Sequence, residues 1–289
     1  MFTEITSWKR AALICGVLIA YSAPANADGI LVKDGQKIVF MGDSITAMGG
    51  AQAGYCQQVI RGLAANSIKA TMICAGVGGN TSKQMLARME SDVIAQKPDW
   101  MTLSCGVNDV WSDLPLDQFK QNMTKIVDKA QAAKIGVILL TATAIGENPT
   151  APKNQQMKPY NEFLHQLAKD KKCRLADLNV DLQAAVMAAG GGTQSQRGNV
   201  MTPEGIHPNA LGHEVMALGV LKAMGLNAAQ LEKAQRAWLD IPFLCDVDLK
   251  GGLTLRQYEQ LDALAAKQNR PTSEVIGELV SKSLALAPK

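Results

Sequence analysis

Short apolar runs alternate with amphipathic stretches along the middle of the chain, and this alternation restricts the fold more than any other feature. Five short runs are apolar and have the length of buried strands. They are Lys37–Met41, Thr71–Cys74, Trp100–Cys105, Gly136–Thr143 and the weaker Arg174–Leu178. The stretches between them carry apolar side chains at helical spacing, in Ser82–Gln96, at Phe119, Met123, Ile126, Val127 and Ala130, and at Phe163, Leu164 and Leu167. Strands that alternate with helices predict an α/β fold, with a parallel sheet covered on both faces.

Composition excludes two other classes of protein. With 47% hydrophobic and 19% charged residues, the chain is too apolar for a disordered protein. Its 29 basic and 26 acidic residues are spread along the sequence without a basic block, so the net charge of +3 does not indicate a nucleic-acid partner. The 289 residues suffice for one large domain with a small appendage.

The first 27 residues have the three-part pattern of a secretory signal peptide. Lys9 and Arg10 precede the apolar run Ala11–Ala23, and Pro24–Ala27 ends in small residues where a signal peptidase cleaves. A membrane anchor is the alternative, but the run is too short to span a bilayer comfortably, and no later segment approaches the roughly 20 apolar residues that a span needs. We therefore expect cleavage near Ala27 and a secreted or periplasmic protein that is not attached to a membrane.

Cysteine and histidine are too few for a disulfide scaffold or a recognisable metal centre. Cys15 would leave with the signal peptide, and the five remaining cysteines cannot all pair within one chain. Cys74 and Cys105 each end an apolar run, which favours buried thiols, although one disulfide could form. The three histidines match no metal-ligand spacing, so a metal centre is not expected.

Unusual residues follow the ends of the predicted strands. They occupy the segments Gly42–Thr46, Gly76–Thr81 and Gly106–Asp109, and a fourth segment, Glu204–Asn209, precedes a final helix at Ala210–Met224. Sites in parallel sheets lie beyond the carboxyl ends of the strands. A serine, a glycine-rich turn, an asparagine and a histidine are thus expected at one edge of the sheet.

These residue types are the parts of an acyl-transfer site. The hydroxyl of Ser44 needs a base to take its proton, and His207 is the histidine in a loop at this edge, whereas His165 and His213 fall within predicted helices. A tetrahedral intermediate also needs donors for its oxyanion.

Three donors are available at this edge for the oxyanion. They are the amide of Ser44, an amide in the Gly78–Gly79 turn and the side chain of Asn108. Glycine suits such a turn because the backbone must approach the substrate closely.

At these positions the sequence resembles the SGNH, or GDSL, hydrolases. The resemblance rests on four blocks in the family's order, from about Ile38 to Met224: Gly42-Asp43-Ser44, Gly79 ahead of Asn80-Thr81, Gly106-Val107-Asn108-Asp109, and His207. It implies a flavodoxin-like three-layer α/β/α sandwich and ester hydrolysis through an acyl-serine intermediate, without a cofactor. It also implies an oxyanion hole formed by the amides of Ser44 and Gly79 with the Asn108 side chain.

One position departs from the family pattern. The family usually has aspartate three residues before the histidine, where this chain has Glu204. Its carboxylate could still orient the imidazole of His207 and complete a catalytic triad, although the extra methylene moves it. The alternatives are a Ser44–His207 dyad supported by backbone carbonyls, or a weakened enzyme.

Each block also has a simpler interpretation. Asp43 or Ser44 could merely cap the following helix, and Asn108-Asp109 could be only a turn. The Gly76–Gly79 run could be a nucleotide loop, but it lacks the full G-x-G-x-x-G pattern and the lysine-serine pair of a phosphate loop. The serine elbow of α/β-hydrolases, G-x-S-x-G, is absent around Ser44. Trp111 is a candidate substrate-binding residue, with a core or rim position as the alternative.

The carboxyl end extends beyond the last block. Leu253–Arg256 resembles a strand, and two amphipathic helices follow it, so that residues 241–289 faintly resemble a ribbon-helix-helix module. Such modules are usually DNA-binding dimers, which conflicts with export. A helical hairpin that packs on the sandwich or forms a homodimer is favoured.

The sequence therefore predicts a signal peptide at 1–27, an SGNH hydrolase domain at 28–240 and a helical C-terminal extension at 241–289. The expected function is that of a secreted serine esterase acting on short acyl groups, such as acetyl, on carbohydrate. Hydrolysis of a lipid ester or thioester is the enzymatic alternative. A catalytically silent binding protein on the same scaffold is the alternative from another class.

Overall fold

The computed structural model describes residues 29–192, 199–239, 255–268, 270 and 272–285. The predicted signal peptide lies outside these residues. The chain divides into two compact units, Met1–Leu244 and Cys245–Lys289, with the division four residues from the predicted boundary at 240. In the described part, no helix combines the length and apolar character needed to cross a membrane.

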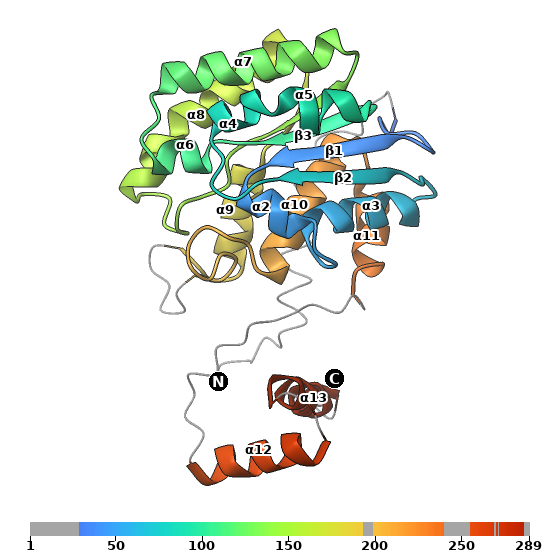
Figure 1. Cartoon of the computed structure of the whole chain (residues 1–289), viewed down its shortest axis with the longest axis vertical. Coiled ribbons are helices and arrows are strands. Elements are labelled where there is room, and N and C mark those ends of the chain that lie inside the picture. Colours follow the sequence, from blue (N-terminus) through green and yellow to red (C-terminus); the bar gives the residue numbers. More distant parts are fainter. Residues whose placement is uncertain (1–28, 193–198, 240–254, 269, 271, 286–289) are drawn as a thin grey trace, which may run out of the picture. The chain divides into compact units, whose positions relative to one another are not determined.

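A five-stranded parallel sheet forms the centre of the first unit (Figure 1). Its spatial order is β2-β1-β3-β4-β5, which is the doubly wound order of flavodoxin-like folds. The strands are β1 (Lys37–Gly42), β2 (Thr71–Gly76), β3 (Trp100–Ser104), β4 (Gly136–Leu140) and β5 (Arg174–Ala176). All five predicted strands are present, each within a few residues of its predicted bounds.

The register brings the carboxyl ends of the central strands level with one another. Gly42 at the end of β1 is opposite Gly76 at the end of β2, and Met41 is opposite Leu103 near the end of β3. The segments that follow these strands consequently leave the sheet at the same edge.

Helices cover both faces of the sheet (Figure 1). One layer holds α2 (Ser44–Gly49), α3 (Tyr55–Ala65), α9 (Leu178–Ala188), α10 (Ala210–Ala223) and α11 (Ala228–Arg236). The other holds α4 (Ser82–Ala87), α5 (Met89–Asp92), a 3-10 turn at Ile94–Gln96, α6 (Val107–Trp111), α7 (Leu116–Ala132) and α8 (Pro152–Asp170). The predicted three-layer sandwich is confirmed, and so is the helical extension at its carboxyl end.

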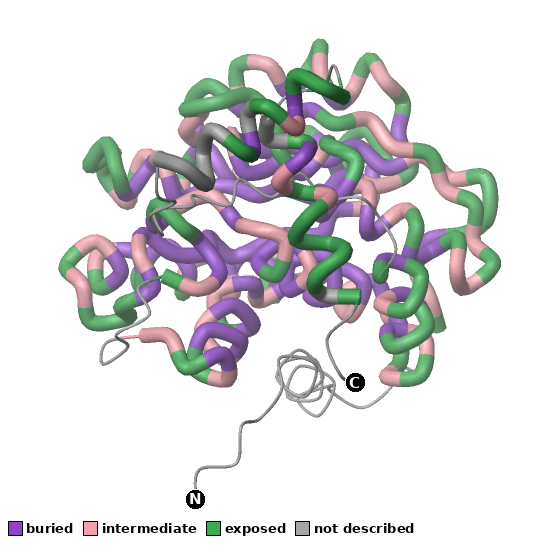
Figure 2. The backbone as a smooth tube through the Cα atoms, turned by 90° about the horizontal axis from the view of Figure 1, so that it is seen from below, coloured by how far each residue is buried: buried purple, intermediate pink, exposed green. Residues whose placement is uncertain are grey.

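The core lies between the sheet and its two helical layers (Figure 2). Ile38 to Met41 in β1 are completely buried because this strand has neighbours on both sides and helices on both faces. The predicted stripe of α7 is also buried, from Phe119 to Ala130. Burial of each such side chain contributes about 1.5–3 kcal/mol.

Two sequence predictions about local structure are wrong. Ser82–Gln96 is not one helix: α4 ends at Ala87, and the chain turns at Arg88 before α5 begins. At this turn the Arg88 side chain donates to the carbonyl groups of Gly42 and Ala75 in the sheet. Cys74 is exposed rather than buried, because it lies on the edge strand β2.

All four cysteines of the described part are free thiols. Cys56 and Cys105 are buried, and Cys173 is half-buried. The sequence predicts mostly buried thiols, and two of these four cysteines are buried.

In the described part of the second unit lie the helices α12 (Leu255–Gln268) and α13 (Thr272–Ala285). They pack through a small apolar cluster formed by Leu261, Ala265 and Val275. The predicted strand Leu253–Arg256 is wrong in its second half, because Leu255 and Arg256 belong to α12; residues 253 and 254 lie outside the described part.

Candidate active site

The turn between β1 and α2 presents Ser44 at the carboxyl edge of the sheet. Asp43 caps α2, because its Oδ1 accepts a hydrogen bond from the amide of Ile45 at 3.0 Å. The Ser44 hydroxyl is thereby released from the capping role. Gly42 is required here, since an added Cβ would lie 2.0 Å from Oγ1 of Thr46.

At this edge of the sheet, the side chain of His207 contacts Ser44 on one ring nitrogen and Glu204 on the other. Oγ of Ser44 is 2.8 Å from Nε2 of His207, and Nδ1 of His207 is 2.5 Å from Oε1 of Glu204. The same Glu204 oxygen accepts the backbone amide of His207 at 2.6 Å. Burial tends to raise the pKa of Glu204, but the hydrogen bonds from His207 outweigh it and hold the pKa below its ordinary value. An ionised Glu204 that accepts from Nδ1 leaves Nε2 free to accept the serine proton.

A buried carboxylate holds the loop that carries Glu204 and His207. Glu147 accepts the amides of Val200, Met201 and Thr202 at 2.6–2.8 Å and the Thr202 hydroxyl at 3.0 Å. Hydrogen bonds to a charged group are stronger than neutral ones, so this carboxylate fixes the start of the loop. Further along, the carbonyl of Gly205 accepts the amide of residue 146 at 2.5 Å.

Two of the predicted oxyanion donors, Gly79 and Asn108, follow the ends of β2 and β3. Asn108 comes from the start of α6, and its Nδ2 donates to the Asn80 carbonyl at 3.1 Å and to Oδ2 of Asp43 at 3.3 Å. Gly79 has a φ of +74°, which L-residues with side chains rarely adopt, and an added Cβ there would meet no atom within 4 Å. An added Cβ on Gly78 would lie 4.0 Å from Cβ of Ser44. The glycine turn therefore borders the serine and exposes its backbone.

Two buried aspartates support the ends of these turns. Burial raises the pKa of Asp43 to about 6, against the opposing effect of the Ile45 amide. Asp109 is completely buried and accepts the amide of Ser82 at 3.0 Å and its hydroxyl at 2.6 Å. Through this bond α6, which carries Asn108, is fixed to the start of α4.

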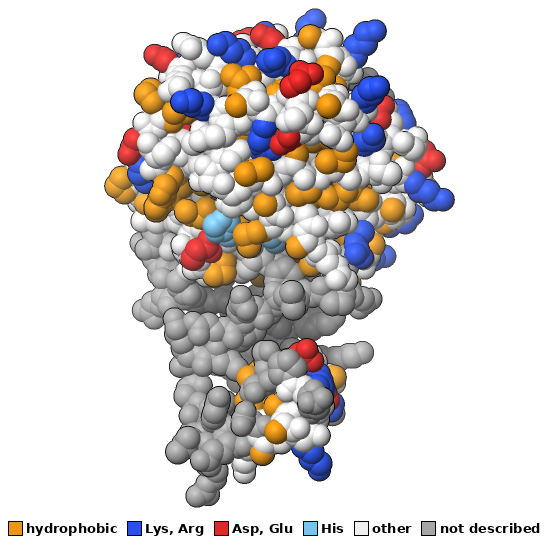
Figure 3. All heavy atoms as spheres, viewed as in Figure 1, with side chains coloured by type: hydrophobic (Ala, Val, Ile, Leu, Met, Phe, Trp, Pro, Cys, Tyr) orange, Lys and Arg blue, Asp and Glu red, His pale blue; other side chains and the backbone are white. Residues whose placement is uncertain are grey.

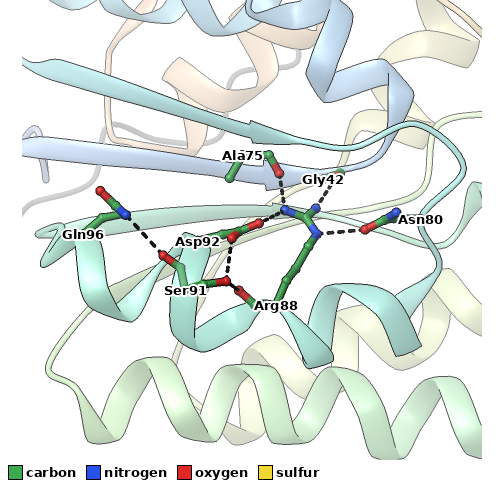
Figure 4. A network of polar contacts seen from close by, with 7 residues as sticks. All are labelled: Gly42, Ala75, Asn80, Arg88, Ser91, Asp92 and Gln96. Atoms are coloured by element: carbon green, nitrogen blue, oxygen red, sulfur yellow. Dashed lines mark hydrogen bonds and ion pairs between the residues drawn. The ribbon is translucent and has the colours of Figure 1, made fainter.

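The Arg88 guanidinium connects three segments that border the site (Figure 4). It donates to the Gly42 carbonyl at 2.7 Å, to the Ala75 carbonyl at 2.8 Å and to Oδ1 of Asn80 at 2.8 Å. Asp92 pairs with it at 2.8 Å. The ends of β1 and β2 and the glycine turn are thus held by one side chain that is only 14% exposed.

We expect Arg88→Met to lower kcat by about 10²-fold with a smaller effect on KM, because a displaced glycine turn misaligns the donors beside Ser44. The variant should also lose about 2–3 kcal/mol in the free energy of unfolding, since the Gly42 and Ala75 carbonyls lose their partner. Ester hydrolysis and urea unfolding measure both quantities. Arg61→Met, which removes an exposed arginine of α3, is the matched control. An unchanged kcat in Arg88→Met would contradict the prediction.

The other two histidines lie in helices, as the sequence predicts. His165 in α8 pairs with Asp177 at 2.9 Å. His213 in α10 is 4% exposed, accepts the Tyr55 amide through Nδ1 at 3.3 Å and stacks on the Tyr55 ring. Neither of these contacts connects a histidine to Ser44.

His213 gives a pH dependence to stability. Burial lowers the pKa of His213 from 6.5 to about 4, so the unfolded state binds a proton that the folded state does not bind between these two values. We therefore expect its contribution to stability to fall by about 3 kcal/mol as the pH decreases from 6.5 to 4. Urea unfolding gives the free energy of unfolding of wild type and of His213→Gln at each pH in this range. The difference between the two proteins isolates His213, because the effects of the carboxylates that both proteins share cancel. A difference that does not change with pH would contradict it.

Trp111 ends α6 and is 57% exposed, three residues from Asn108 on the same helix.

Among the described residues, no group of three or more His, Cys, Asp or Glu side chains is arranged to hold a metal ion. Figure 3 shows Lys and Arg side chains scattered over one face with acidic side chains among them, and no basic patch gathers there.

Sequence reasoning missed the residues that support this site. Asp109 belongs to one of the four sequence blocks, but nothing in the sequence predicts its hydrogen bond with Ser82. Arg88 and Glu147 act on segments 46 and 53 positions away, and only the fold brings them together.

Comparisons with known proteins identify esterases among the relatives of this chain. The model of the GDSL-like lipase/acylhydrolase family matches residues 40–215. An acetylxylan esterase of Geobacillus stearothermophilus is 30% identical over 217 residues, which are 67% of this chain and 96% of that protein. The crystal structure of Axe2, an acetylxylan esterase from the same organism, superposes with a TM-score of 0.61 at 26% identity over 69% of this chain and 98% of that one. A second solved structure, the acetyl xylan esterase AlAXEase, gives a TM-score of 0.58 at 29% identity over 64% and 97% of the two chains.

Proposed function

Because the chain belongs to the GDSL-like lipase/acylhydrolase family and is a carboxylic ester hydrolase, we propose that it removes acetyl and other short acyl groups from carbohydrate. We assign the nucleophile to Ser44, the general base to His207 and the orienting carboxylate to Glu204. The observation that carries the assignment is the line of contacts of 2.8 Å and 2.5 Å through both ring nitrogens of His207.

In the proposed mechanism, Ser44 Oγ attacks the ester carbonyl carbon while Nε2 of His207 takes the hydroxyl proton. The amides of Ser44 and Gly79 and the side chain of Asn108 donate to the oxyanion of the tetrahedral intermediate. The imidazolium then protonates the leaving sugar oxygen, and an acyl-serine remains. Water, deprotonated by the same imidazole, then attacks the carbonyl carbon of the acyl-serine. The bond from that carbon to Ser44 Oγ breaks, the imidazolium returns its proton to Oγ, and the carboxylic acid is released.

Solved variants of Axe2 support the three roles. Alanine variants of one serine, one aspartate and one histidine of that enzyme are described as catalytic mutants, and its aspartate precedes the histidine by three positions. Glu204 precedes His207 by the same interval. This shared spacing supports the proposal that Glu204 has the role of the orienting acid.

Glu204→Gln separates a triad from a dyad. We expect kcat to fall by about 10³- to 10⁴-fold, because the neutral amide neither fixes the productive tautomer of His207 nor stabilises the imidazolium. Glu204→Asp, with the residue that is usual in the family, is the conservative control and should keep most of the activity. Steady-state hydrolysis of p-nitrophenyl acetate measures both. An unchanged kcat in Glu204→Gln would remove Glu204 from the mechanism and favour a dyad.

We propose that Trp111 contacts the sugar. It is exposed, and residues three apart on a helix share a face, so its ring is on the side of α6 that carries Asn108. An exposed aromatic ring offers an apolar surface with a polar edge, which suits a sugar that has both kinds of group.

A substrate panel tests the proposed substrate class. The purified protein is assayed with acetylated xylooligosaccharides, p-nitrophenyl esters from acetate to palmitate, and an acyl thioester, with Ser44→Ala as the blank. We expect kcat/KM for acetyl esters to exceed that for octanoyl and longer esters by at least about tenfold. A maximum at long acyl chains or at the thioester would overturn the carbohydrate assignment and favour a lipid or thioester substrate.

We also propose that the protein is exported to the periplasm or beyond the cell. The basic residues Lys9 and Arg10, the apolar run and the small residues before Asp28 support this proposal. Amino-terminal sequencing of the protein recovered outside the cytoplasm should begin near Asp28. Recovery of the uncleaved chain in the cytoplasm would overturn it.

A further inference from the structure

Two cysteines from different elements contact the same residue of α2. Cys56 is in α3 and Cys74 is in β2, and both thiols are directed at the carbonyl oxygen of Thr46, at 3.9 Å and 3.2 Å. Because both thiols contact this one oxygen atom, the two side chains lie beside each other. Neither takes part in the proposed hydrolysis.

The end of α2 is shaped to accommodate this pair. Gly49 and Gly50 are consecutive, and an added Cβ on Gly49 would lie 3.0 Å from Sγ of Cys56. An added Cβ on Gly50 would lie 2.8 Å from Sγ of Cys74. Each glycine therefore leaves room for one of the two sulfur atoms.

The two thiols differ in exposure and acidity. Cys74 is exposed, and the hydrogen bond from Cys56, together with the backbone amides of Gly76 and Gly50, lowers the pKa of its thiol to about 6 against the effect of partial burial. Cys56 is completely buried, and burial and the neighbouring Cys74 raise its pKa. An accessible thiolate beside a protected thiol is the usual arrangement of an attacking and a resolving cysteine.

We infer that Cys56 and Cys74 form a dithiol site that reacts with disulfide oxidants, either small disulfides or the disulfide of a thiol oxidoreductase, to give an intramolecular disulfide between α3 and β2. This site is separate from the proposed esterase function and does not depend on it.

The reaction proceeds in two exchange steps. The Cys74 thiolate attacks one sulfur of the oxidant, a mixed disulfide forms, and the other sulfur leaves as a thiolate. The charge on Cys74 that raises the pKa of Cys56 is then gone, and Cys56 loses its proton to solvent and attacks Sγ of Cys74. The Cys56–Cys74 bond forms and the second oxidant sulfur leaves. Two protein thiols are oxidised, and one oxidant disulfide is reduced to two thiols.

The disulfide would close the loop between residues 56 and 74, which restricts the unfolded chain and raises the melting temperature. The Thr46 carbonyl would keep the amide of Gly50, at 3.1 Å, as its donor. Because the bond lies at the opposite end of α2 from Ser44, we expect ester hydrolysis to persist after oxidation.

Peptide mapping of the purified full chain tests the inference. The reduced protein is incubated with oxidised glutathione, alkylated and digested with trypsin. Cys56 then falls in the peptide 38–61 and Cys74 in the peptide 70–83. We expect these two peptides as one linked species that lacks two hydrogen atoms, together with a melting temperature several degrees above that of the reduced protein.

Matched variants identify the two roles. Cys56→Ser should retain glutathione on Cys74, and Cys74→Ser should leave Cys56 unreacted, whereas Cys173→Ser should form the link as wild type does. The inference is overturned if wild type yields both cysteines as alkylated thiols, a lasting glutathione adduct on Cys74, or a link from either cysteine to Cys173 or Cys245. These readouts do not involve ester hydrolysis, so an inactive enzyme could still carry the disulfide.

Discussion

We expect Ser44→Ala to lower kcat on p-nitrophenyl acetate by on the order of 10⁶-fold and to leave KM nearly unchanged. The hydroxyl makes its decisive interaction in the transition state, where its oxygen bonds to the ester carbon, so its loss removes little binding of the ground state. The variant should also lose all covalent labelling by a fluorophosphonate, which reacts with an activated serine.

The loss should be chemical rather than structural. Asp43, and not Ser44, caps α2, so the free energy of unfolding should change by less than about 1 kcal/mol. Ser281→Ala, at an exposed serine of α13, is the control and should keep full activity and full labelling. Turnover by Ser44→Ala equal to that of wild type, or labelling of another residue, would refute the nucleophile.

The sheet could be predicted because its strands are buried on both faces. A central parallel strand such as β1 must be apolar at every position, and Ile38–Met41 stands out in the sequence for this reason. The short β5 gave a weaker signal, since Arg174 and Leu175 are only half-buried at the edge of the sheet.

The candidate site could be predicted as far as it depends on topology. Parallel strands with aligned ends bring the turns after β1, β2 and β3 to one edge, whatever their separation along the chain. Ser44, Gly79 and Asn108 are in those turns. The positions of the strand ends do not predict that His207 and Glu204 approach Ser44, because no strand directly precedes the loop that carries them.

The supporting residues could not be predicted from periodicity. Glu147 lies after β4, yet it binds amides at 200–202, and a charged residue in a polar loop gives no indication of burial. Arg88 is in a stretch of helical periodicity, yet it lies at the turn between α4 and α5 and binds the Gly42 and Ala75 carbonyls. In both cases a long-range hydrogen bond overrides the local pattern.

His207→Ala is expected to lower kcat as far as Ser44→Ala does, on the order of 10⁶-fold, because nucleophile and base act as one unit. The double variant should consequently be no worse than either single variant. Fluorophosphonate labelling of Ser44 should become very slow, since the hydroxyl keeps its proton. His165→Ala is the matched control, because the imidazole of His165 in α8 pairs with Asp177, the N-cap of α9, and its removal should leave kcat unchanged.

Added imidazole gives the sharper measurement. The His207 side chain is 33% exposed, so its removal opens a space that solvent can reach beside Oγ of Ser44. Free imidazole that enters this space can accept the serine proton, and kcat of His207→Ala should rise with imidazole concentration and saturate. Ser44→Ala has no proton to give and should show no such rise. If His207→Ala retained more than about a hundredth of the wild-type kcat without imidazole, another group would have to be the base.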